Sequence, residues 1–218
     1  MEEKLIIELL KKGGEELSMP LPDASISLFL RYLKELKAWN KKINLTSIED
    51  DREIILRHFI DSLIPYRYLE GSKRLLDIGA GAGFPGIPLK ALDPSIRVTL
   101  IDSIEKKVHF LRHVIRTLGL KEIEAVHGRV EDKAIMERYA LSFDCVISRA
   151  FSELKDYLRL SLPYVAPGGI IIAVKGPAYE KDLEAAKWFK GVDKPEVFEV
   201  NLPFTDRTTV ILRFRKTI

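Results

Sequence analysis

Residues 74–86 read RLLDIGAGAGFPG, a short apolar run with four glycines after it. Leu75, Leu76 and Ile78 suit a buried parallel strand, and the glycines suit a tight turn whose backbone can approach a ligand closely. Pro85 fits the first turn of a following helix, where the missing N–H of proline costs no hydrogen bond. A strand, a glycine-rich turn and a helix in this order predict a site for a nucleotide-like cofactor.

The glycine spacing leaves two classes of cofactor open. Gly81, Gly83 and Gly86 satisfy G-x-G-x-x-G. Asp102 lies near the distance at which dinucleotide folds place a ribose-binding carboxylate, which favours a nicotinamide cofactor. Asp77 favours a different ligand, because a carboxylate at the strand tip beside the loop repels a pyrophosphate and attracts a cation such as S-adenosylmethionine. A structural Asp77 that caps the turn is the remaining alternative.

Composition limits the class of protein. The 218 residues are 46% hydrophobic and 31% charged, and no apolar run approaches the ~18 residues of a membrane-spanning helix. Because the chain starts with Met-Glu-Glu instead of a signal peptide, we expect a soluble cytoplasmic protein with no membrane partner. The single cysteine, Cys145, cannot form an internal disulfide, and no Cys/His cluster has zinc-site spacing, so we expect no metal. A net charge of +3 does not by itself predict nucleic-acid binding, and we expect a monomer.

The chain divides into a helical region at residues 1–72 and an α/β region at residues 73–218. Apolar residues recur at helical spacing in the first region, as at Ile26 and Phe29, and a polar turn follows in which Ser47 is the expected cap of the next helix. From residue 74 onward strands alternate with helices, which predicts a doubly wound α/β fold that ends in an antiparallel hairpin. Strands are expected at 74–79, 97–102, 123–127, 143–148, 169–175, 197–202 and 208–214, and helices near 86–92, 105–118, 131–140, 153–162 and 179–190.

The residues that follow the first two strands are candidates for the cofactor site, because ligands of open α/β sheets lie at the carboxyl ends of the strands. Gly79 and Gly81 allow close approach after the first strand, and Phe84 offers an apolar contact. Asp102, followed by Ser103, ends the second strand. Its carboxylate can accept hydrogen bonds from both ribose hydroxyls, or it can cap the next helix.

The later strands add charged candidates. After the third strand, Glu131 can accept from an adenine edge or serve as a first-turn helix charge. After the fourth, Arg149 places a permanent cation at the mouth of the site, suited to a carboxylate, a phosphate, a guanine edge or an ion pair. Lys175, after the fifth, is a second cation on the same rim. We assign Arg149 and Lys175 to positioning at the catalytic site.

The tip of the fourth strand also bears on the reaction. It lacks the Asn/Asp-Pro-Pro-aromatic sequence that commonly serves methylation of exocyclic amines. Cys145 lies inside the strand, so we expect a buried small hydrophobe and no thiolate chemistry. Guanine N7 is a lone-pair acceptor with no proton to remove, and its methylation depends on alignment more than on a general base. The absence of an obvious base fits that reaction.

Seven motifs together resemble the RsmG (GidB) family, the bacterial methyltransferases of guanine N7 in 16S small-subunit ribosomal RNA. They are WNKKINLTSI, RHFIDSL, LLDIGAGAGFPGIPLK, LIDSIEKKVHFLR, GRVED, ISRAF and VKG, and they cover most of the chain. The resemblance implies a Rossmann-like class I S-adenosylmethionine-dependent methyltransferase domain at 73–218, with a seven-stranded mostly parallel sheet, behind an N-terminal helical cap at 1–72. It also implies a cofactor site lined by Gly79, Phe84, Val130, Glu131 and Arg149, with Asp102 at the ribose.

The expected partner is small-subunit ribosomal RNA, either free or within the 30S particle. Two other functions stay open. An NAD-dependent oxidoreductase would keep the glycine loop, although Asp77 and the missing catalytic acid or base argue against it. A noncatalytic RNA-binding protein would keep the basic surfaces without turnover. Our hypothesis for the RNA-facing surface, continuous with Arg149 and Lys175, comprises Lys41, Lys42, Asn44, Arg57 and His58.

Overall fold

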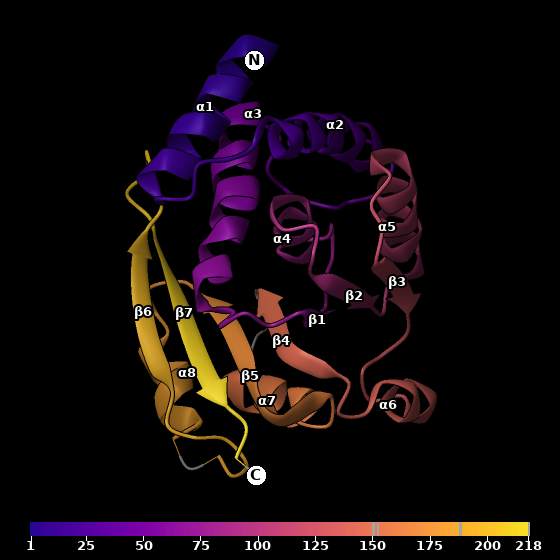
Figure 1. Ribbon diagram of the computed structural model, residues 1–218, viewed down its shortest axis with the longest axis vertical. Coiled ribbons are helices and arrows are strands. Elements are labelled where there is room, and N and C mark those ends of the chain that lie inside the picture. Colours follow the sequence, from indigo (N-terminus) through magenta and orange to yellow (C-terminus); the bar gives the residue numbers. More distant parts are fainter. Residues whose placement is uncertain (150, 152, 188, 218) are drawn as a thin grey trace.

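The computed structural model describes every residue of the chain except 150, 152, 188 and 218. Its centre is a seven-stranded sheet in the order β3-β2-β1-β4-β5-β7-β6 (Figure 1). Neighbours among β1 to β5 are parallel, and β7 is antiparallel to both β5 and β6. The predicted α/β class and the antiparallel hairpin at one edge are therefore confirmed. The strands are β1 (Arg74–Ile78), β2 (Arg97–Asp102), β3 (Ile123–His127), β4 (Phe143–Arg149), β5 (Val165–Lys175), β6 (Glu196–Asn201) and β7 (Thr208–Arg215).

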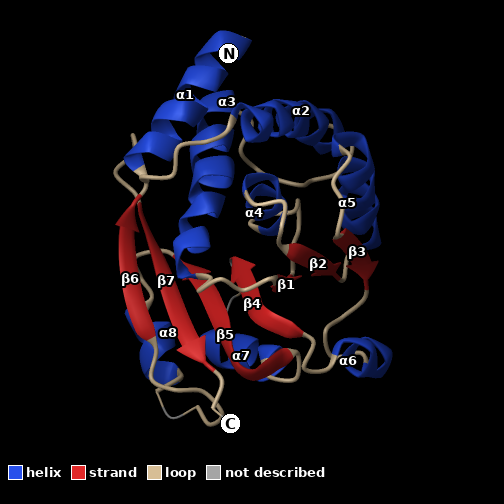
Figure 2. Ribbon diagram, in the orientation of Figure 1, coloured by secondary structure: helices blue, strands red, loops and turns tan. Residues whose placement is uncertain are grey.

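Two groups of helices enclose the sheet, one above and one below it in the orientation of Figure 2. The upper group comprises α1 (Glu3–Glu16), α2 (Asp23–Asn40), α3 (Asp51–Ile54), the π-helix η1 (Ile55–Ile60), the 3-10 helix η2 (Asp61–Tyr68), α4 (Gly86–Leu92) and α5 (Glu105–Leu118). The lower group comprises α6 (Lys133–Tyr139), α7 (Leu154–Ser161) and α8 (Glu180–Ala185).

Alternate strand residues enter two separate apolar cores, one on each face of the sheet. Leu75 of β1 and Cys145 of β4 belong to the core under the upper helices, and their neighbours Leu76 and Val146 belong to the other. Because both faces are covered, the central strands carry consecutive apolar residues, which is why the sequence marks them clearly. The helices of residues 1–72 share the first core with the sheet. The boundary between residues 72 and 73 stays a prediction.

The turn between α2 and α3 differs from the predicted one. Asp50, and not Ser47, caps the next helix, because the Asp50 side chain accepts a hydrogen bond of 3.0 Å from the backbone N–H of Glu53. Ser47 is exposed and precedes the helix by four residues. The turn is longer than expected because the Asn40 side chain bonds to the backbone of Leu45 and Thr46 and gives it a structure of its own.

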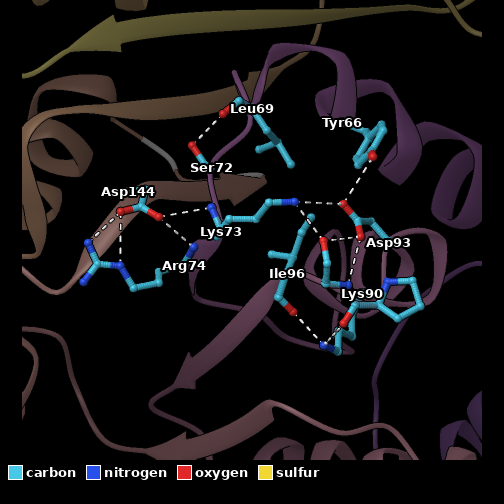
Figure 3. A network of polar contacts seen from close by, with 11 residues as sticks. Tyr66, Leu69, Ser72, Lys73, Arg74, Lys90, Asp93, Ile96 and Asp144 are labelled. Carbon is cyan, nitrogen blue, oxygen red and sulfur yellow. Dashed lines mark hydrogen bonds and ion pairs between the residues drawn. The ribbon is translucent and has the colours of Figure 1, made fainter.

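A polar network fixes the amino ends of the strands, away from the end where ligands bind (Figure 3). The Asp144 carboxylate accepts hydrogen bonds of 3.0 Å from the backbone N–H groups of both Lys73 and Arg74, and it pairs with the Arg74 guanidinium at 2.6 Å. Lys90, only 2% exposed, donates to the carbonyls of Pro94 and Ile96. These bonds tie β1 to β4 and α4 to the turn before β2, so this end of the sheet is structural.

Candidate active site at the carboxyl ends of the strands

The loop after β1 contains two kinds of glycine. Gly79 and Gly81 have φ values of +69° and +60°, and a Cβ at Gly79 would meet no atom within 4 Å. In contrast, a Cβ at Gly83 would lie 2.6 Å from the Tyr32 hydroxyl, and one at Gly86 would lie 2.4 Å from a side chain of β2. Gly79 and Gly81 therefore leave the backbone open to a ligand, whereas Gly83 and Gly86 permit close packing. In a dinucleotide fold the second glycine of G-x-G-x-x-G lets the backbone approach the pyrophosphate, but here Gly83 is packed against Tyr32, which weakens the nicotinamide alternative.

Asp77 is buried beneath this loop. It lies one residue before the end of β1 and is 0% exposed. Its Oδ2 accepts a hydrogen bond of 2.9 Å from the Gly86 N–H, while its Oδ1 has no partner among the described residues. Burial raises the pKa of the carboxyl to about 7. The sequence places Asp77 at the strand tip beside a ligand. The structure corrects that placement, because the side chain turns inward and does not line the cavities described next.

A first cavity of about 170 Å³ lies at the ends of β1, β2 and β3. The Asp102 carboxylate, 5% exposed, accepts hydrogen bonds of 2.8 Å from the backbone N–H groups of Gly81 and Ile104. These bonds hold the glycine loop and the turn before α5, whose N-cap is Ile104 with no side-chain cap, so Asp102 does not cap the helix as the sequence alternative had it. Each carboxylate oxygen keeps a further lone pair for a ligand hydroxyl. Phe151 and Leu160 add apolar walls that the sequence did not indicate. Five predicted cofactor residues line this cavity, and they are Gly79, Asp102, Ser103, Val130 and Glu131.

A second cavity of about 180 Å³ shares Gly79 with the first and extends over the glycine loop. Gly81, Phe84 and Arg149 line it, as predicted for cofactor residues. The Phe84 ring is only 5% exposed, because it stacks on the rings of Tyr32 and His58 with centroid distances of 5.3 and 4.9 Å. Phe84 is thus mainly a packing residue whose edge forms part of the cavity wall.

Arg149 connects β4 to the helices that precede the sheet. Its Nη1 donates to the Arg57 carbonyl at 3.0 Å and pairs with the Asp61 carboxylate at 3.2 Å, while its Nη2 donates to His58 Nδ1 at 3.2 Å. The Arg57 carbonyl is available because the backbone changes from π-helix to 3-10 helix at this point. The Asp61 N–H donates to the carbonyls of Leu56 and His58 and makes no bond to the carbonyl of Arg57. The ion pair that the sequence left as an alternative role for Arg149 is therefore present.

His58 is a neutral ring in this arrangement. Burial, and after it the positive charge of Arg149, lowers the pKa of His58 to about 3. Its Nε2 lies 2.7 Å from the hydroxyl of Thr46. Both ring nitrogens are therefore engaged within the protein, and His58 does not present a charge to RNA. The structure thus assigns it to the wall of the site instead of the predicted basic surface.

A third and larger cavity, about 610 Å³, shares His58 and Arg149 with the second. Arg57, Lys175 and Arg207 also line it. Neighbouring cavities share lining residues, so the three adjoin one another along the carboxyl ends of the strands. The first two are bounded by the glycine loop, and the third is bounded by three arginines and a lysine.

The cations of the third cavity differ in how they are paired. The Lys175 ammonium donates to the Phe151 carbonyl at 2.8 Å and to the Asp182 carboxylate at 2.7 Å, so its charge is neutralised locally. Arg57 lies 3.6 Å from Glu53. Arg207 is exposed and makes no side-chain ion pair with any residue that the structure describes. Sequence reasoning did not single out Arg207, whose only signal is its place in the turn between the last two strands.

The predicted RNA-facing residues fall into two groups. Arg57 and His58 line the third cavity, whereas Lys41, Lys42 and Asn44 are exposed in the turn that follows α2 and do not reach it. Lys41 lines a neighbouring cavity together with Thr46 and Ile48, which also line the second and the third cavity respectively. Thr46 and Asp61 contact the site residues His58 and Arg149, and sequence reasoning missed both as site residues.

Other expectations concern residues away from the cavities. Cys145 is fully buried inside β4, as predicted, and burial raises the pKa of its thiol far above the usual range. Within the described part of the chain, no group of His, Cys, Asp and Glu side chains could hold a metal ion. None of the described helices is both long enough and apolar enough to cross a membrane.

Comparison with known proteins identifies close relatives in sequence. Residues 25–208 match the family model of rRNA small subunit methyltransferase G. The ribosomal RNA small subunit methyltransferase G of Acetivibrio thermocellus is 42% identical over 216 residues, which cover 96% of this chain and 89% of that protein. The protein of the same name from Geobacter sulfurreducens is 41% identical and covers 94% of this chain and 96% of its own length.

Solved structures of other methyltransferases share the fold. An O-methyltransferase from Bacillus cereus in complex with SAH has a TM-score of 0.64 and 17% identity, and the match covers 94% of this chain and 96% of that one. The tRNA (m1A58) methyltransferase TrmI from Aquifex aeolicus has a TM-score of 0.58 and 18% identity, with 72% of this chain and 68% of that one covered. At these identities the likeness shows the class I methyltransferase fold alone.

Proposed function

The chain belongs to the rRNA small subunit methyltransferase G family, and on that premise we propose that it transfers a methyl group from S-adenosylmethionine to N7 of a guanine in 16S ribosomal RNA. The observation that carries this proposal is the row of adjoining cavities, in which the two cavities at the glycine loop border a larger basic cavity at Arg149 and His58. A cofactor and a nucleotide can lie there end to end. The enzyme would act in the cytoplasm on the small-subunit RNA, either free or in the 30S particle.

The residues of the first two cavities fit S-adenosylmethionine. Gly79 leaves open space where a side chain would stand, and the Asp102 carboxylate keeps lone pairs for ribose hydroxyls. The buried carboxyl of Asp77 beneath the loop, whose pKa is about 7, is ionised above that pH and then favours a cationic ligand over a pyrophosphate. Ser103 and Glu131 line the same cavity and offer polar contacts to the adenosine part. When bound, this cofactor supplies an electrophilic methyl group, and its transfer moves a positive charge from sulfur to the guanine ring.

Arg149 and His58 suit a reaction without proton removal. Guanine N7 attacks through a lone pair, so no base is required. His58 is neutral, and its Nδ1 is already occupied by the Arg149 guanidinium, so this histidine serves as a fixed wall and not as a base. The charge of Arg149 is compensated by Asp61 at 3.2 Å, so the arginine can orient a guanine edge with less opposition to the positive charge that develops on the base.

The RNA would be held at two places. The third cavity, about 610 Å³, has room for a nucleotide extruded from its stack, with Arg207 available for a phosphate. Lys41, Lys42 and Asn44 are exposed on the turn after α2 and would contact the RNA backbone farther from the reacting base. Lys175 is paired with Asp182, so it would contact the RNA at the rim of the cavity through its shape and hydrogen bonds more than through its charge.

The proposal is tested by two measurements on the purified protein. Calorimetry with S-adenosylmethionine and, separately, with NAD reports which cofactor binds. Incubation with methyl-labelled cofactor and small-subunit particles that lack the modification reports transfer to RNA. We expect binding of S-adenosylmethionine and incorporation of label. NAD binding alone would support the oxidoreductase alternative, and RNA binding with no turnover would support a noncatalytic protein.

A further inference from the structure

The turn between α2 and α3 is held by hydrogen bonds from one side chain, that of Asn40. The Asn40 Oδ1 accepts hydrogen bonds of 2.9 and 3.0 Å from the backbone N–H groups of Leu45 and Thr46. Its Nδ2 donates to the Thr46 carbonyl at 2.9 Å. Because the same carboxamide makes three bonds, it fixes the place at which Thr46 leaves the turn. Aspartate at this position could accept the first two bonds but could not donate the third.

The neutral His58 ring lies between the Arg149 guanidinium and the Thr46 hydroxyl. The Arg149 guanidinium can only donate, so the His58 Nδ1 that faces it at 3.2 Å must be a bare acceptor. The single proton of the neutral ring then lies on Nε2 and is donated to the Thr46 hydroxyl at 2.7 Å. The backbone N–H of Ile48 also donates to that hydroxyl, at 3.1 Å, which fixes the orientation of its lone pairs.

The histidine and the arginine then share one aromatic surface. The His58 ring stacks on Phe84 at 4.9 Å with an angle of 19° between the planes, and the Arg149 guanidinium carbon lies 5.2 Å from the centre of the same ring. Arg149 thus donates to three acceptors, the Arg57 carbonyl, the Asp61 carboxylate and His58 Nδ1. Of these, only the His58 ring is in turn contacted by Thr46 of the turn between α2 and α3. Loss of the Thr46 hydroxyl would leave the Nε2 proton without this acceptor and free the ring to rotate away from the guanidinium.

We propose that Thr46, held in place by Asn40, is a positioning residue for methyl transfer that acts through His58 to orient the Arg149 guanidinium at the junction of the cofactor and nucleotide cavities. This inference rests on the proposed function for the reaction it serves. The network itself stands on the distances alone. It also gives the turn that carries Lys41 and Lys42 a direct connection to the reacting site, since both lysines lie between Asn40 and Thr46 in the chain.

Two variants of Thr46 separate positioning from folding. Thr46→Val keeps the shape and removes the hydroxyl, whereas Thr46→Ser keeps the hydroxyl and removes a methyl group. We expect Thr46→Val to lower kcat for RNA methylation by about 10- to 100-fold, the size of effect that small misplacements produce. The KM for RNA and the Kd of S-adenosylmethionine should stay within about twofold, and Thr46→Ser should recover most of kcat. Ser47→Ala, a change at the exposed neighbour, is the matched control and should leave kcat unchanged.

A spectroscopic readout tests the same inference without turnover. In protein labelled with ¹⁵N at its four histidines, His58→Asn identifies the His58 signals by their loss. We expect one protonated and one bare ring nitrogen in the wild type, with the proton on Nε2, and a changed pattern in Thr46→Val and Asn40→Ala. An unchanged pattern in Thr46→Val, or a kcat equal to that of the wild type, would overturn the proposal. A wild type that binds no cofactor would overturn the proposed function instead and would leave the tautomer result readable.

Discussion

Replacement of Asp77 by asparagine tests whether ionisation of this buried carboxyl beneath the glycine loop lowers the free energy of unfolding. The carboxyl has an ordinary pKa of 3.8 and is raised to about 7 by burial, which the Gly86 N–H and Arg149 oppose only in part. At about 1.4 kcal/mol per pKa unit, a shift of about three units disfavours the ionised native state by roughly 4 kcal/mol. Asparagine keeps the acceptor for Gly86 and carries no charge to desolvate.

The sign of the pH dependence follows from proton counts. Between the two pKa values the native state holds a proton on Asp77 that the unfolded chain has released, so the stability of the wild type falls as pH rises toward about 7 and then levels off. The asparagine variant has no such loss, because its side chain does not titrate. We therefore expect the stability of Asp77→Asn relative to wild type to increase by about 3 kcal/mol from about pH 5 to about pH 8.

Urea denaturation of both proteins at several pH values measures this difference. Asp144→Asn is the matched control, since the pKa of Asp144 is lowered: burial raises it, but hydrogen bonds from Arg74 and Lys73 lower it more. That variant should be destabilised by an amount that does not change over the same pH range. At pH 8, where the wild-type carboxyl is ionised, Asp77→Asn should also weaken the binding of S-adenosylmethionine by about tenfold, because a charge that attracts a cation is lost. A pH-independent stability difference for Asp77→Asn would refute the reasoning.

Two further predictions concern RNA. The double variant Lys41→Ala with Lys42→Ala should weaken RNA binding. The slope of the logarithm of the binding constant against the logarithm of salt concentration should fall in magnitude by about one to two, because two phosphate contacts are lost. The same pair of changes at Lys11 and Lys12 on α1 should leave the slope unchanged, and an unchanged slope in the first variant would exclude Lys41 and Lys42 from the RNA interface. Arg207→Ala should raise the KM for RNA by about tenfold and leave cofactor affinity unchanged, with partial recovery in Arg207→Lys; an unaltered KM would show that the cavity holds no phosphate at this arginine.

The sequence predicts much of the fold for a physical reason. Strands covered on both faces carry consecutive apolar residues, such as Leu75-Leu76 in β1 and Val146-Ile147 in β4, so they can be recognised without any knowledge of their partners. The candidate cofactor residues follow from topology, since Gly79, Asp102 and Glu131 lie at or after the ends of β1, β2 and β3, and parallel strands end at the same edge of the sheet.

The polar partners in the site could not be read from the chain in the same way. Asp61 pairs with Arg149 from 88 residues away, on a helix whose irregular hydrogen bonding leaves the Arg57 carbonyl free. No local sequence pattern predicts such a change from π-helix to 3-10 helix. The inward turn of Asp77 depends on the close approach of Gly86, and the neutral state of His58 depends on burial and on Arg149. These properties arise only when distant segments pack together.

The most direct test of the proposed reaction is the chemical identity of the methylated atom. Small-subunit particles that lack the modification would be treated with the protein and S-adenosylmethionine, and the RNA would then be probed by reduction-dependent strand cleavage, which occurs at 7-methylguanine. We predict cleavage at one guanine of the 16S RNA, dependent on both protein and cofactor. Label incorporated without that cleavage, or no label in either particles or free RNA, would contradict methyl transfer to guanine N7.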